Sequence, residues 1–244
     1  MTTWRRVPYL WDEGQQATPL YWLTLPEPLA NWDVWETWER PRADSMRQHL
    51  DKGACLFDVG AEHGWLSCVY ADMVGPENMV LIEPTAEFWP NIRETWNRNC
   101  DREPRGCYDG LFSNVTMDDR AAFPGWPQSS TGDLISANKY RCICENDPAV
   151  PEITLDDYVA RSGIVPDAIT IDVEGAELLV LQGAAGTLRN RPLLWISVHP
   201  DLMVRDYAAT FPELHAYLEG FGYVGQHLAS DHEEHWFYRP RVGL

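Results

Sequence analysis

Short, almost wholly apolar runs alternate with helix-forming segments through most of this chain, and this alternation constrains the fold more than any other feature. The runs have the continuous hydrophobicity of parallel strands that are covered on both faces. They read ACLFDVG from residue 54, MVLIEP from 79, AITIDVEG from 168 and LLWISVHP from 193. Helical patterns lie between and after them, over residues 65–74, 86–99, 154–162 and 211–219. The alternation predicts an α/β fold with a doubly wound, mostly parallel sheet and helices on both faces.

Weaker patterns complete the predicted sheet. A third strand is expected around residues 105–114, and the helix after residue 175 has one apolar stripe, made by Leu181, Ala184, Ala185 and Leu188. Residues 115–151 are rich in Gly, Pro, Ser and Asp, which predicts a long loop with an edge strand near Tyr140–Cys144. Strand candidates at 223–229 and 235–240 flank a polar turn, so a final hairpin is expected to add one antiparallel strand.

The first fifty residues differ from the rest because they contain six of the twelve tryptophans. We treat residues 1–50 as an aromatic, helical extension and residues 51–244 as the main domain. Residues 31–50 favour helices that break near Pro41, because proline disrupts a helix interior. Two interpretations stay open: the aromatic side chains pack on the main core, or they form a lid or wall that recognises a substrate.

Thirty-seven acidic residues against 19 lysines and arginines give the chain a formal charge of −18. This excess argues against a nucleic-acid backbone or an anionic membrane as main partner, because both attract basic surfaces. No run of 18 apolar residues predicts a transmembrane helix, and the first residues lack the apolar core of a signal peptide. The six cysteines show no CxxC pair or zinc spacing, so we expect reduced thiols in a cytoplasmic protein.

Glycines and acids follow the first two predicted strands, at the sheet edge where such folds bind ligands. The segment DVGAEHG, from Asp58 to Gly64, permits a tight turn and a close approach of a ligand to the backbone. Its DxGxxxG spacing differs from the GxGxxG turn, which presents bare amides to a pyrophosphate. Glu83 ends the second strand, where a carboxylate accepts the two hydroxyls of a ribose. An adenosine with a positive sulfonium fits these acids, so we expect S-adenosylmethionine as the cofactor.

Four segments resemble the FkbM family of S-adenosylmethionine-dependent methyltransferases: FDVGAEHGW, LIEPTAEFWPNIRETWNRN, ITLDDYV and ITIDVEGAELLVLQGA, in this order. The resemblance covers residues 54–190, and IDVEGAE with VLQGA is its most specific part. It implies a class I methyltransferase fold, which is Rossmann-like and has a seven-stranded sheet with an antiparallel last strand. It also implies O-methylation of a hydroxyl on a sugar, a glycan or a natural-product-like small molecule.

The resemblance also assigns roles by position. It implies that the turn after the first strand lines the methionine end of the cofactor and that Glu83 holds the ribose. The adenine is expected near the segment after the third strand, and the transferred methyl group beside Asp172 and Glu174. The expected cofactor-binding residues are Asp58, Gly60, Ala61, Glu62, Gly64, Glu83, Ser113 and Asn114.

His199 is the expected general base, with Asp172 and Glu174 completing the catalytic set. It ends the fifth predicted strand, where the family commonly has a carboxylate. Its ordinary pKa of about 6.5 suits proton transfer near neutrality. A fifth strand parallel to the fourth brings His199 near Asp172, which would position either the histidine or the substrate.

A divalent metal is a less favoured alternative at the same edge. Asp172, His199 and either His232 or His235 offer the nitrogen and oxygen ligands that such ions bind. The three ligands come from three separate segments, so their spacing in the sequence cannot test this set. We therefore treat the acidic run DHEEH, residues 231–235, as a solvated turn.

Two other functions remain open at this point. The first is a nicotinamide-dependent oxidoreductase or epimerase on the doubly wound fold, although the sequence lacks GxGxxG and a Tyr-x-x-x-Lys pair. The second is a nucleoside-binding module that has lost catalysis, which Glu62 and His199 suggest because they depart from the family pattern. For a methyltransferase, the expected partner is a small-molecule or glycan acceptor that stacks on tryptophan faces.

Overall fold

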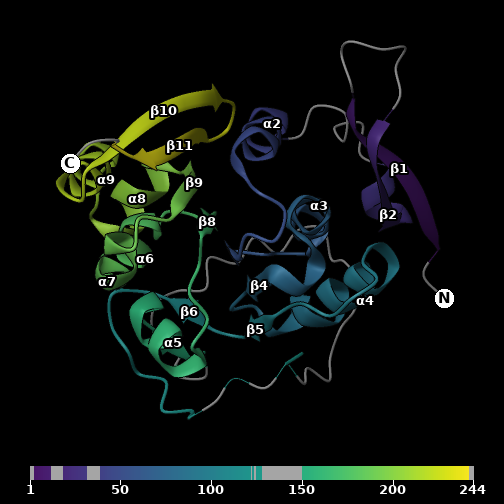
Figure 1. The fold of residues 1–244 in the computed structure, drawn as a ribbon, viewed down its shortest axis with the longest axis horizontal. Coiled ribbons are helices and arrows are strands. Elements are labelled where there is room, and N and C mark those ends of the chain that lie inside the picture. The colour runs from purple at the N-terminus through teal and green to yellow at the C-terminus, as the bar shows by residue number, and fades with distance from the viewer. Residues whose placement is uncertain are drawn as a thin grey trace.

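A seven-stranded sheet forms the centre of the molecule (Figure 1). The computed structural model describes residues 3–11, 19–31, 39–121, 123, 125–127 and 150–241. The strands of this sheet stand in the order β10-β11-β9-β8-β3-β4-β5. Their bounds are Leu56–Val59 (β3), Met79–Ile82 (β4), Gly106–Tyr108 (β5), Ala168–Ile171 (β8), Leu193–Val198 (β9), Tyr223–Ser230 (β10) and Glu234–Pro240 (β11).

The pairing of the strands confirms the predicted fold class. Strands β5, β4, β3, β8 and β9 pair in parallel, in this order. The last strand, β11, is antiparallel to both β9 and β10, so the predicted final hairpin inserts it between them. Because β4 and β8 lie on opposite sides of β3, the strand order reverses at β3. In open α/β sheets this switch point is where ligands bind, outside the carboxyl ends of the strands.

Successive residues of a strand point to opposite sides of the sheet. Because both sides of these strands are apolar, helices cover both faces of the sheet. Leu56 and Leu81 pack on the face that carries α3 and α4, whereas Phe57 and Val80 pack on the other. The helices of the first face span Trp65–Val74 (α3) and Trp89–Asn99 (α4), with 3-10 turns at Pro76–Asn78 (η1) and Ala86–Phe88 (η2). Those of the second face span Leu155–Ser162 (α5), Glu177–Gln182 (α6), Ala185–Arg189 (α7), Pro200–Tyr207 (α8) and Phe211–Gly220 (α9).

Several elements differ from the sequence predictions. Helix α8 is not predicted, because Pro200 was interpreted only as the end of a strand, whereas proline also favours the first turn of a helix. The predicted third strand divides into β5 and β6 (Leu111–Phe112), and β6 pairs with β7 (Glu152–Ile153) in a separate two-stranded sheet. The predicted helix after β8 divides into α6 and α7 at Gly183. The predicted edge strand at Tyr140–Cys144 lies outside the described residues.

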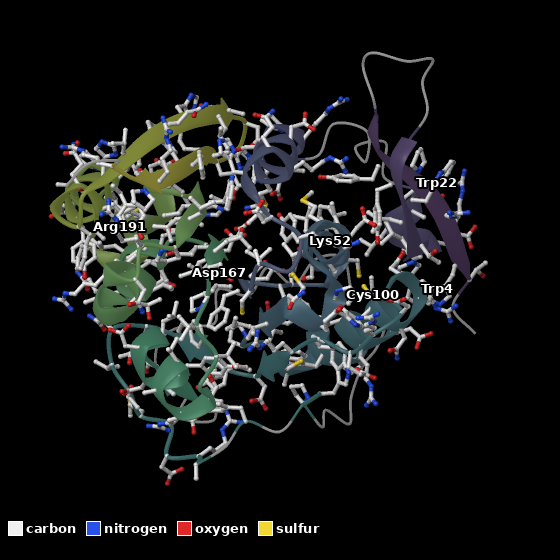
Figure 2. All side chains as sticks on the ribbon, in the orientation of Figure 1. Trp4, Trp22, Lys52, Cys100, Asp167 and Arg191 are labelled. Carbon is white, nitrogen blue, oxygen red and sulfur yellow. The ribbon has the colours of Figure 1, made fainter. Side chains whose placement is uncertain are left out.

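The N-terminal segment adds a β-hairpin and a helix to the main sheet layers. Strands β1 (Trp4–Trp11) and β2 (Pro19–Pro26) are antiparallel, and Figure 2 shows Trp4 and Trp22 on this hairpin. β2 contacts α3 and α4, and its apolar residues Leu23 and Leu25 are fully buried. After the short α1 (Glu27–Ala30), helix α2 (Arg40–His49) contacts β10, β11 and α3.

Only part of this segment follows the sequence prediction. The hairpin is not predicted, and Pro41 does not break a helix, because it lies in the first turn of α2 where a missing N–H costs little. The buried hairpin residues support packing of the extension on the main core. Trp32, Trp35 and Trp38 lie outside the described residues.

No helix among the described residues is long and apolar enough to cross a membrane. Cys55, Cys68, Cys100 and Cys107 are free thiols, whereas the other two cysteines lie outside the described residues. Burial raises the pKa of Cys55 to about 11, so this thiol stays protonated and unreactive near neutral pH.

Gly60 occupies the most crowded backbone position at the switch point. It has a φ of +95°, and a Cβ atom there would lie 1.8 Å from the carbonyl oxygen of Asp172. The N–H of Asp172 donates to the carbonyl of Val59, so Asp172 cannot withdraw without separating β3 from β8. The glycine thus makes room for a neighbouring strand end, in addition to any ligand.

We expect Gly60→Ala to destabilise the protein far more than Gly53→Ala. Gly53 has nearly the same φ, +94°, but a Cβ there would meet nothing within 4 Å. The control therefore adds only left-handed backbone strain, about 1–2 kcal/mol, whereas the backbone clash at Gly60 should exceed it by at least ~2 kcal/mol. Urea unfolding measures both, and equal losses would show that the contact with Asp172 is not restrictive.

Candidate functional site

The carboxyl ends of four parallel strands gather polar residues from distant parts of the chain. Asp58 is the penultimate residue of β3. Glu83 follows β4, Asp172 follows β8 and His199 follows β9. Asp58, Glu83 and His199 are buried, and Asp172 is partly exposed. The sheet therefore places these four predicted site residues along one edge.

Glu83 is held firmly at this edge by two backbone donors. Its Oε2 accepts the N–H of Glu62 at 2.9 Å, and its Oε1 accepts the N–H of Thr85 at 2.7 Å. Glu62 adopts a left-handed backbone with a φ of 48°, which is unfavourable for a residue other than glycine. Such strain persists mainly where the surroundings enforce it, and it is common in binding sites.

The glycine turn joins β3 to β4 and starts α3. The N–H groups of Gly60 and Ala61 both donate to the carbonyl oxygen of Ile82, at 2.9 and 3.0 Å. Gly64 precedes α3 with a φ of +75°, and its N–H donates to the carbonyl of Ala61. This turn brings Glu62 back over the end of β4, beside Glu83.

Three carboxyl groups around the turn have raised pKa values. Burial raises the pKa of Asp58 to about 6, although a hydrogen bond from Ser67 opposes the rise. Burial likewise raises the pKa of Glu83 to about 7. The side chain of Glu62 is 42 % exposed, yet partial burial and then the charge of Glu83 raise its pKa to about 8. A cationic ligand would stabilise the ionised form of all three groups.

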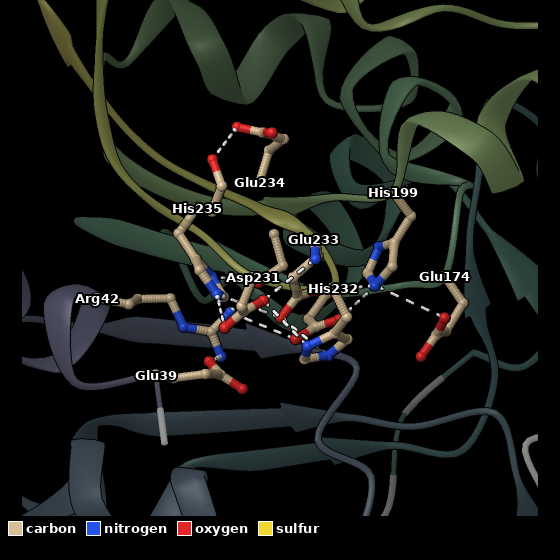
Figure 3. Close-up of polar contacts among 12 residues, drawn as sticks. Glu39, Arg42, Glu174, His199, Asp231, His232, Glu233, Glu234 and His235 are labelled. Carbon is tan, nitrogen blue, oxygen red and sulfur yellow. Dashed lines mark hydrogen bonds and ion pairs between the residues drawn. The ribbon is translucent and has the colours of Figure 1, made fainter. Parts of the chain in front are cut away.

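His199 lies at the centre of a second group of acids (Figure 3). Its Nδ1 lies 2.8 Å from Oε1 of Glu177, and a carboxylate oxygen can only accept, so Nδ1 carries a hydrogen. Its Nε2 lies 2.8 Å from Oε2 of Glu233, 3.6 Å from Oε2 of Glu174 and 3.9 Å from Oδ1 of Asp172. We call these five residues the His199 cluster.

The three predicted catalytic residues therefore lie together, and the role of His199 as general base stays a prediction. Burial opposes protonation of the ring, yet Glu177, Glu233 and Asp172 outweigh it and raise the pKa of His199 to about 11. A ring with this raised pKa can accept a proton only after it has lost the hydrogen on Nε2. The predicted ordinary pKa did not take account of Glu177 and Glu233.

Arg42 connects the N-terminal helix α2 to the His199 cluster. Its side chain is 2 % exposed, forms an ion pair with Glu39, and lies 3.4 Å from Oδ2 of Asp172. Its Nη1 also donates to Oγ of Ser197 at 2.5 Å, and its guanidinium lies over the ring of Tyr70. The extension thus supplies a cation to the predicted site, which no sequence motif indicated.

The DHEEH segment is not simply a solvated turn. Asp231 and His232 are exposed, but Glu233 is 3 % exposed and His235 is fully buried. The ligand atoms of His235 lie near those of Glu39 and Glu233, not in a group with Asp172 and His199. The metal-ligand set predicted with His232 or His235 is therefore not assembled among the described residues.

Ser113 and Asn114 lie beyond the end of β5, in the segment after β6. Oγ of Ser113 donates to Glu152 at 2.5 Å, and Nδ2 of Asn114 donates to Gln182 at 3.2 Å. These bonds place both residues against β7 and α6. Their role beside an adenine stays a prediction.

Sequence reasoning missed three residues of this site, and two of them had a usable signal. Glu177 is an acid in the otherwise apolar stretch ELLVLQ, where a buried position demands a partner. Glu233 directly precedes Glu234, which pairs with Val198 at the end of β9. Its burial therefore follows once the pairing of the hairpin with β9 is known. Arg42 had no signal, because its contacts with Asp172 and Ser197 span more than a hundred residues of sequence.

The residues present fit a bound S-adenosylmethionine. Asp58, Glu62 and Glu83 lie at the switch point, and burial is the main cause of their raised pKa values. A sulfonium and an ammonium group would supply that charge. Each oxygen of Glu83 accepts one backbone N–H and keeps a second lone pair for a ribose hydroxyl.

The strand order, with β11 antiparallel between β9 and β10, defines a class I methyltransferase fold. The sequence profile of the methyltransferase FkbM domain matches residues 58–224, so the chain belongs to the FkbM methyltransferase family. That profile describes a methyltransferase domain. The matched range includes the glycine turn, Glu83 and every residue of the His199 cluster except Glu233.

The hexuronic acid methyltransferase AglP of Haloferax volcanii is 22% identical over 170 residues, which cover 69% of this chain and 65% of AglP, less than two thirds of that relative. The methyltransferase FkbM of Methylobacillus flagellatus has a TM-score of 0.49 and 17% identity, over 78% of this chain and 44% of that one. M. jannaschii TYW2, solved in complex with AdoMet, has a TM-score of 0.46 and 13% identity, over 96% and 94% of the two chains.

We expect Arg42→Met to lower the free energy of unfolding by about 3–5 kcal/mol, because it removes the shared cation of buried Glu39 and nearby Asp172. Arg47→Met is the matched control, since Arg47 lies on the same helix and is exposed. Its effect should stay within about 0.5 kcal/mol. Urea unfolding compares them, and small losses in both variants would refute a stabilising role for Arg42.

Proposed function

We propose that this protein methylates a hydroxyl oxygen of a sugar, carried by a glycan or a glycosylated small molecule. The observation that supports this most directly is the His199 cluster, which sets several hydrogen-bond acceptors beside the cofactor-binding strand end. A hydroxyl group is the acceptor that such a site can hold and orient. AglP is named for a hexuronic acid, which makes sugars the first class of acceptor to test.

Three residues are proposed to hold the cofactor. Bound S-adenosylmethionine supplies a methyl group on a positively charged sulfur. Glu83 accepts the ribose hydroxyls with its remaining lone pairs, and Asp58 and Glu62 face the positively charged methionine end across the glycine turn. The rigid hydrogen bonds to Glu62 and Thr85 fix the ribose, and therefore the direction of the reacting bond.

Asp172 and Glu174 are proposed to orient the acceptor. The acceptor oxygen forms its bond to the methyl carbon as the carbon–sulfur bond breaks, and that electron pair stays with sulfur. The hydroxyl proton must leave during this transfer. Carboxylate oxygens of Asp172 and Glu174 accept a hydrogen bond from the hydroxyl, which aligns the oxygen with the methyl group, and one of these carboxylates takes the proton as the new bond forms. His199 lies behind them, held by Glu177.

The charge of the cluster favours a neutral hydroxyl over a carboxylate acceptor. A uronate carboxylate placed there would meet Asp172, Glu174 and Glu233 at short range, and like charges repel in partly buried surroundings. Membership of the FkbM family also argues against the nicotinamide-dependent alternative. A catalytically silent protein would bind the cofactor without turnover, which the assay below distinguishes.

The acceptor is tested with S-adenosylmethionine labelled in its methyl group. We expect label on a hexuronic acid glycoside or a neutral hexoside, in a form that resists mild alkali as a methyl ether does. Release as methanol would indicate a methyl ester and overturn the hydroxyl assignment. Asp172→Asn should lower turnover by about 10²-fold, with affinity for S-adenosylhomocysteine little changed. Cofactor binding without transfer to any saccharide would refute the proposed acceptor class.

Cofactor affinity should rise with pH through the pKa of Glu83, about 7. Ribose hydroxyls favour the ionised carboxylate, so binding lowers this pKa, is strongest above pH 7 and weakens as pH falls. Between pH 8 and pH 6 the ionised fraction of Glu83 falls roughly tenfold, and the affinity should follow.

Calorimetry with S-adenosylhomocysteine measures this dependence. Glu83→Gln should weaken binding at pH 8 and flatten its change between pH 8 and pH 6. Glu87→Gln is the control, because Glu87 lies four residues further along the chain and is exposed. A pH dependence that survives in Glu83→Gln would assign it to another group.

A further inference from the structure

The turn between β8 and α6, residues 172–176, contains two consecutive residues with a left-handed backbone. Glu174 has a φ of 54° and Gly175 a φ of +104°. This conformation is unfavourable at Glu174, which has a side chain, and such strain persists where the surroundings enforce it. The turn begins with Asp172 and has Glu174 at its middle. Whatever holds the β8–α6 turn therefore also sets the direction of these two carboxylates.

One side of the β8–α6 turn packs directly on helix α8. A Cβ atom at Gly175 would lie 2.9 Å from the backbone carbonyl carbon of Leu202 and 3.0 Å from the backbone nitrogen of Met203. The N–H of Met203 donates to the carbonyl of His199, which precedes the same helix. The turn and His199 thus lie side by side, and position 175 has no room for a side chain.

Glu177 joins the turn and the histidine through a single atom. Its Oε1 accepts from the N–H of Gly175 at 3.0 Å and from Nδ1 of His199 at 2.8 Å. Its side chain is completely buried. A buried carboxylate is costly unless its partners compensate for the lost water, and hydrogen bonds in such surroundings are stronger than in water. The two bonds to this oxygen therefore hold two separate segments in one arrangement.

The bond to Glu177 also fixes how the imidazole of His199 lies. Because Nδ1 carries the hydrogen that Glu177 accepts, this oxygen sets the plane of the ring and the direction of Nε2. Nε2 forms an ion pair with Glu233 at 2.8 Å and lies 3.6 Å from Glu174 and 3.9 Å from Asp172 (Figure 3). Rotation of the ring would break the pair with Glu233 and turn Nε2 away from the acids of the turn.

We propose that Glu177 is a positioning residue for methyl transfer, which holds the β8–α6 turn and the ring of His199 in register through its Oε1. This inference rests on the proposed function, in which Asp172 and Glu174 orient the acceptor hydroxyl. Glu177 is itself completely buried, so it acts through Glu174, whose side chain is 46 % exposed, and through His199. A displacement of about 1 Å at reacting groups can lower a rate ~10²-fold.

Two substitutions separate the hydrogen bonds of Glu177 from its charge. Glu177→Gln keeps an oxygen that can accept from Gly175 and His199, whereas Glu177→Ala removes it. With labelled S-adenosylmethionine and the saccharide acceptor, Glu177→Ala should lower kcat ~10²-fold. The KM for S-adenosylmethionine should change less than about threefold, because the lost interaction acts on the acceptor side. Glu177→Gln should restore most of the lost kcat at pH 7.

Asp156→Asn is the matched control. Asp156 on α5 also joins two elements, because its carboxylate accepts the backbone N–H groups of Gly186 and Thr187 on α7. These partners do not belong to the His199 cluster. The control should unfold at a lower urea concentration than the wild type, with kcat of the folded protein unchanged. A merely structural role for Glu177 would give the same result in Glu177→Ala.

Nuclear magnetic resonance of protein labelled with ¹⁵N in its histidines measures the hold on His199 without any acceptor. The charged groups around this ring are Glu177 of α6, Glu233 before β11, Asp172 and Glu174 of the turn, and, beyond these acids, Arg42, His232 and His235. Burial opposes protonation of the ring, and Glu177 favours it. The ring should therefore lose its proton at a lower pH in both variants, but Nδ1 should keep its hydrogen only in Glu177→Gln and the wild type.

Wild-type kcat in Glu177→Ala, or equal losses of kcat in Glu177→Ala and Glu177→Gln at pH 7, would overturn the positioning role. If Glu177→Ala does not fold, Glu177→Asp replaces it, because a side chain shorter by one methylene should not reach both donors. A His199 ring that Glu177 fixes in a protein that methylates no saccharide would refute the proposed acceptor and leave the hold intact. Saccharide methylation by Glu177→Ala at the wild-type rate would do the reverse.

Discussion

The structure depends most on one electrostatic constraint: the carboxyl edge of the sheet concentrates acids that the chain itself only partly neutralises. The parallel strands force this arrangement, because β3, β4, β8 and β9 all end at the same edge. Asp58, Glu83 and Asp172 each follow or end a buried strand, so they cannot be moved to open solvent without unravelling the sheet. Burial at this edge is the main cause of their raised pKa values. The protein tolerates this cost at the edge where we propose that a cationic cofactor binds.

The N-terminal extension takes part in this balance, although it lies outside the family match. Helix α2 packs on the final hairpin and carries Arg42 into the protein, where it faces Asp172 and Ser197. The hairpin in turn carries Glu233 toward His199. Two peripheral elements thus enclose the edge of the central sheet. This explains how a site defined by the family motifs gains residues that those motifs do not contain.

Local patterns in the sequence were enough to predict the sheet, but not the partners of the site residues. The continuous apolar runs and the glycine breaks fixed β3, β4, β8 and β9 to within a few residues, because burial on both faces leaves a strong local signal. Strand topology then placed Asp172, Glu174 and His199 together. The protonation of His199, however, depends on Glu177 and Glu233, whose burial is a property of packed α6 and of the hairpin register. Glycine 60 shows the same limit, since its constraint is the carbonyl of Asp172, far away in sequence.

The direction of charge movement during methyl transfer explains why the acids of the glycine turn and the acids of the His199 cluster need different roles. Positive charge leaves the sulfur in the transition state, so acids close to the sulfur bind the reactant more tightly than the transition state and slow the step. Asp58, Glu62 and Glu83 therefore serve best when they hold the ribose and the ammonium group. On the acceptor side, uncompensated carboxylates would keep the hydroxyl proton in place by their field. In the proposed reaction, Arg42 and protonated His199 would offset that field near Asp172 and Glu174. These cations would let the same acidic edge both attract the cofactor and release the proton of the acceptor.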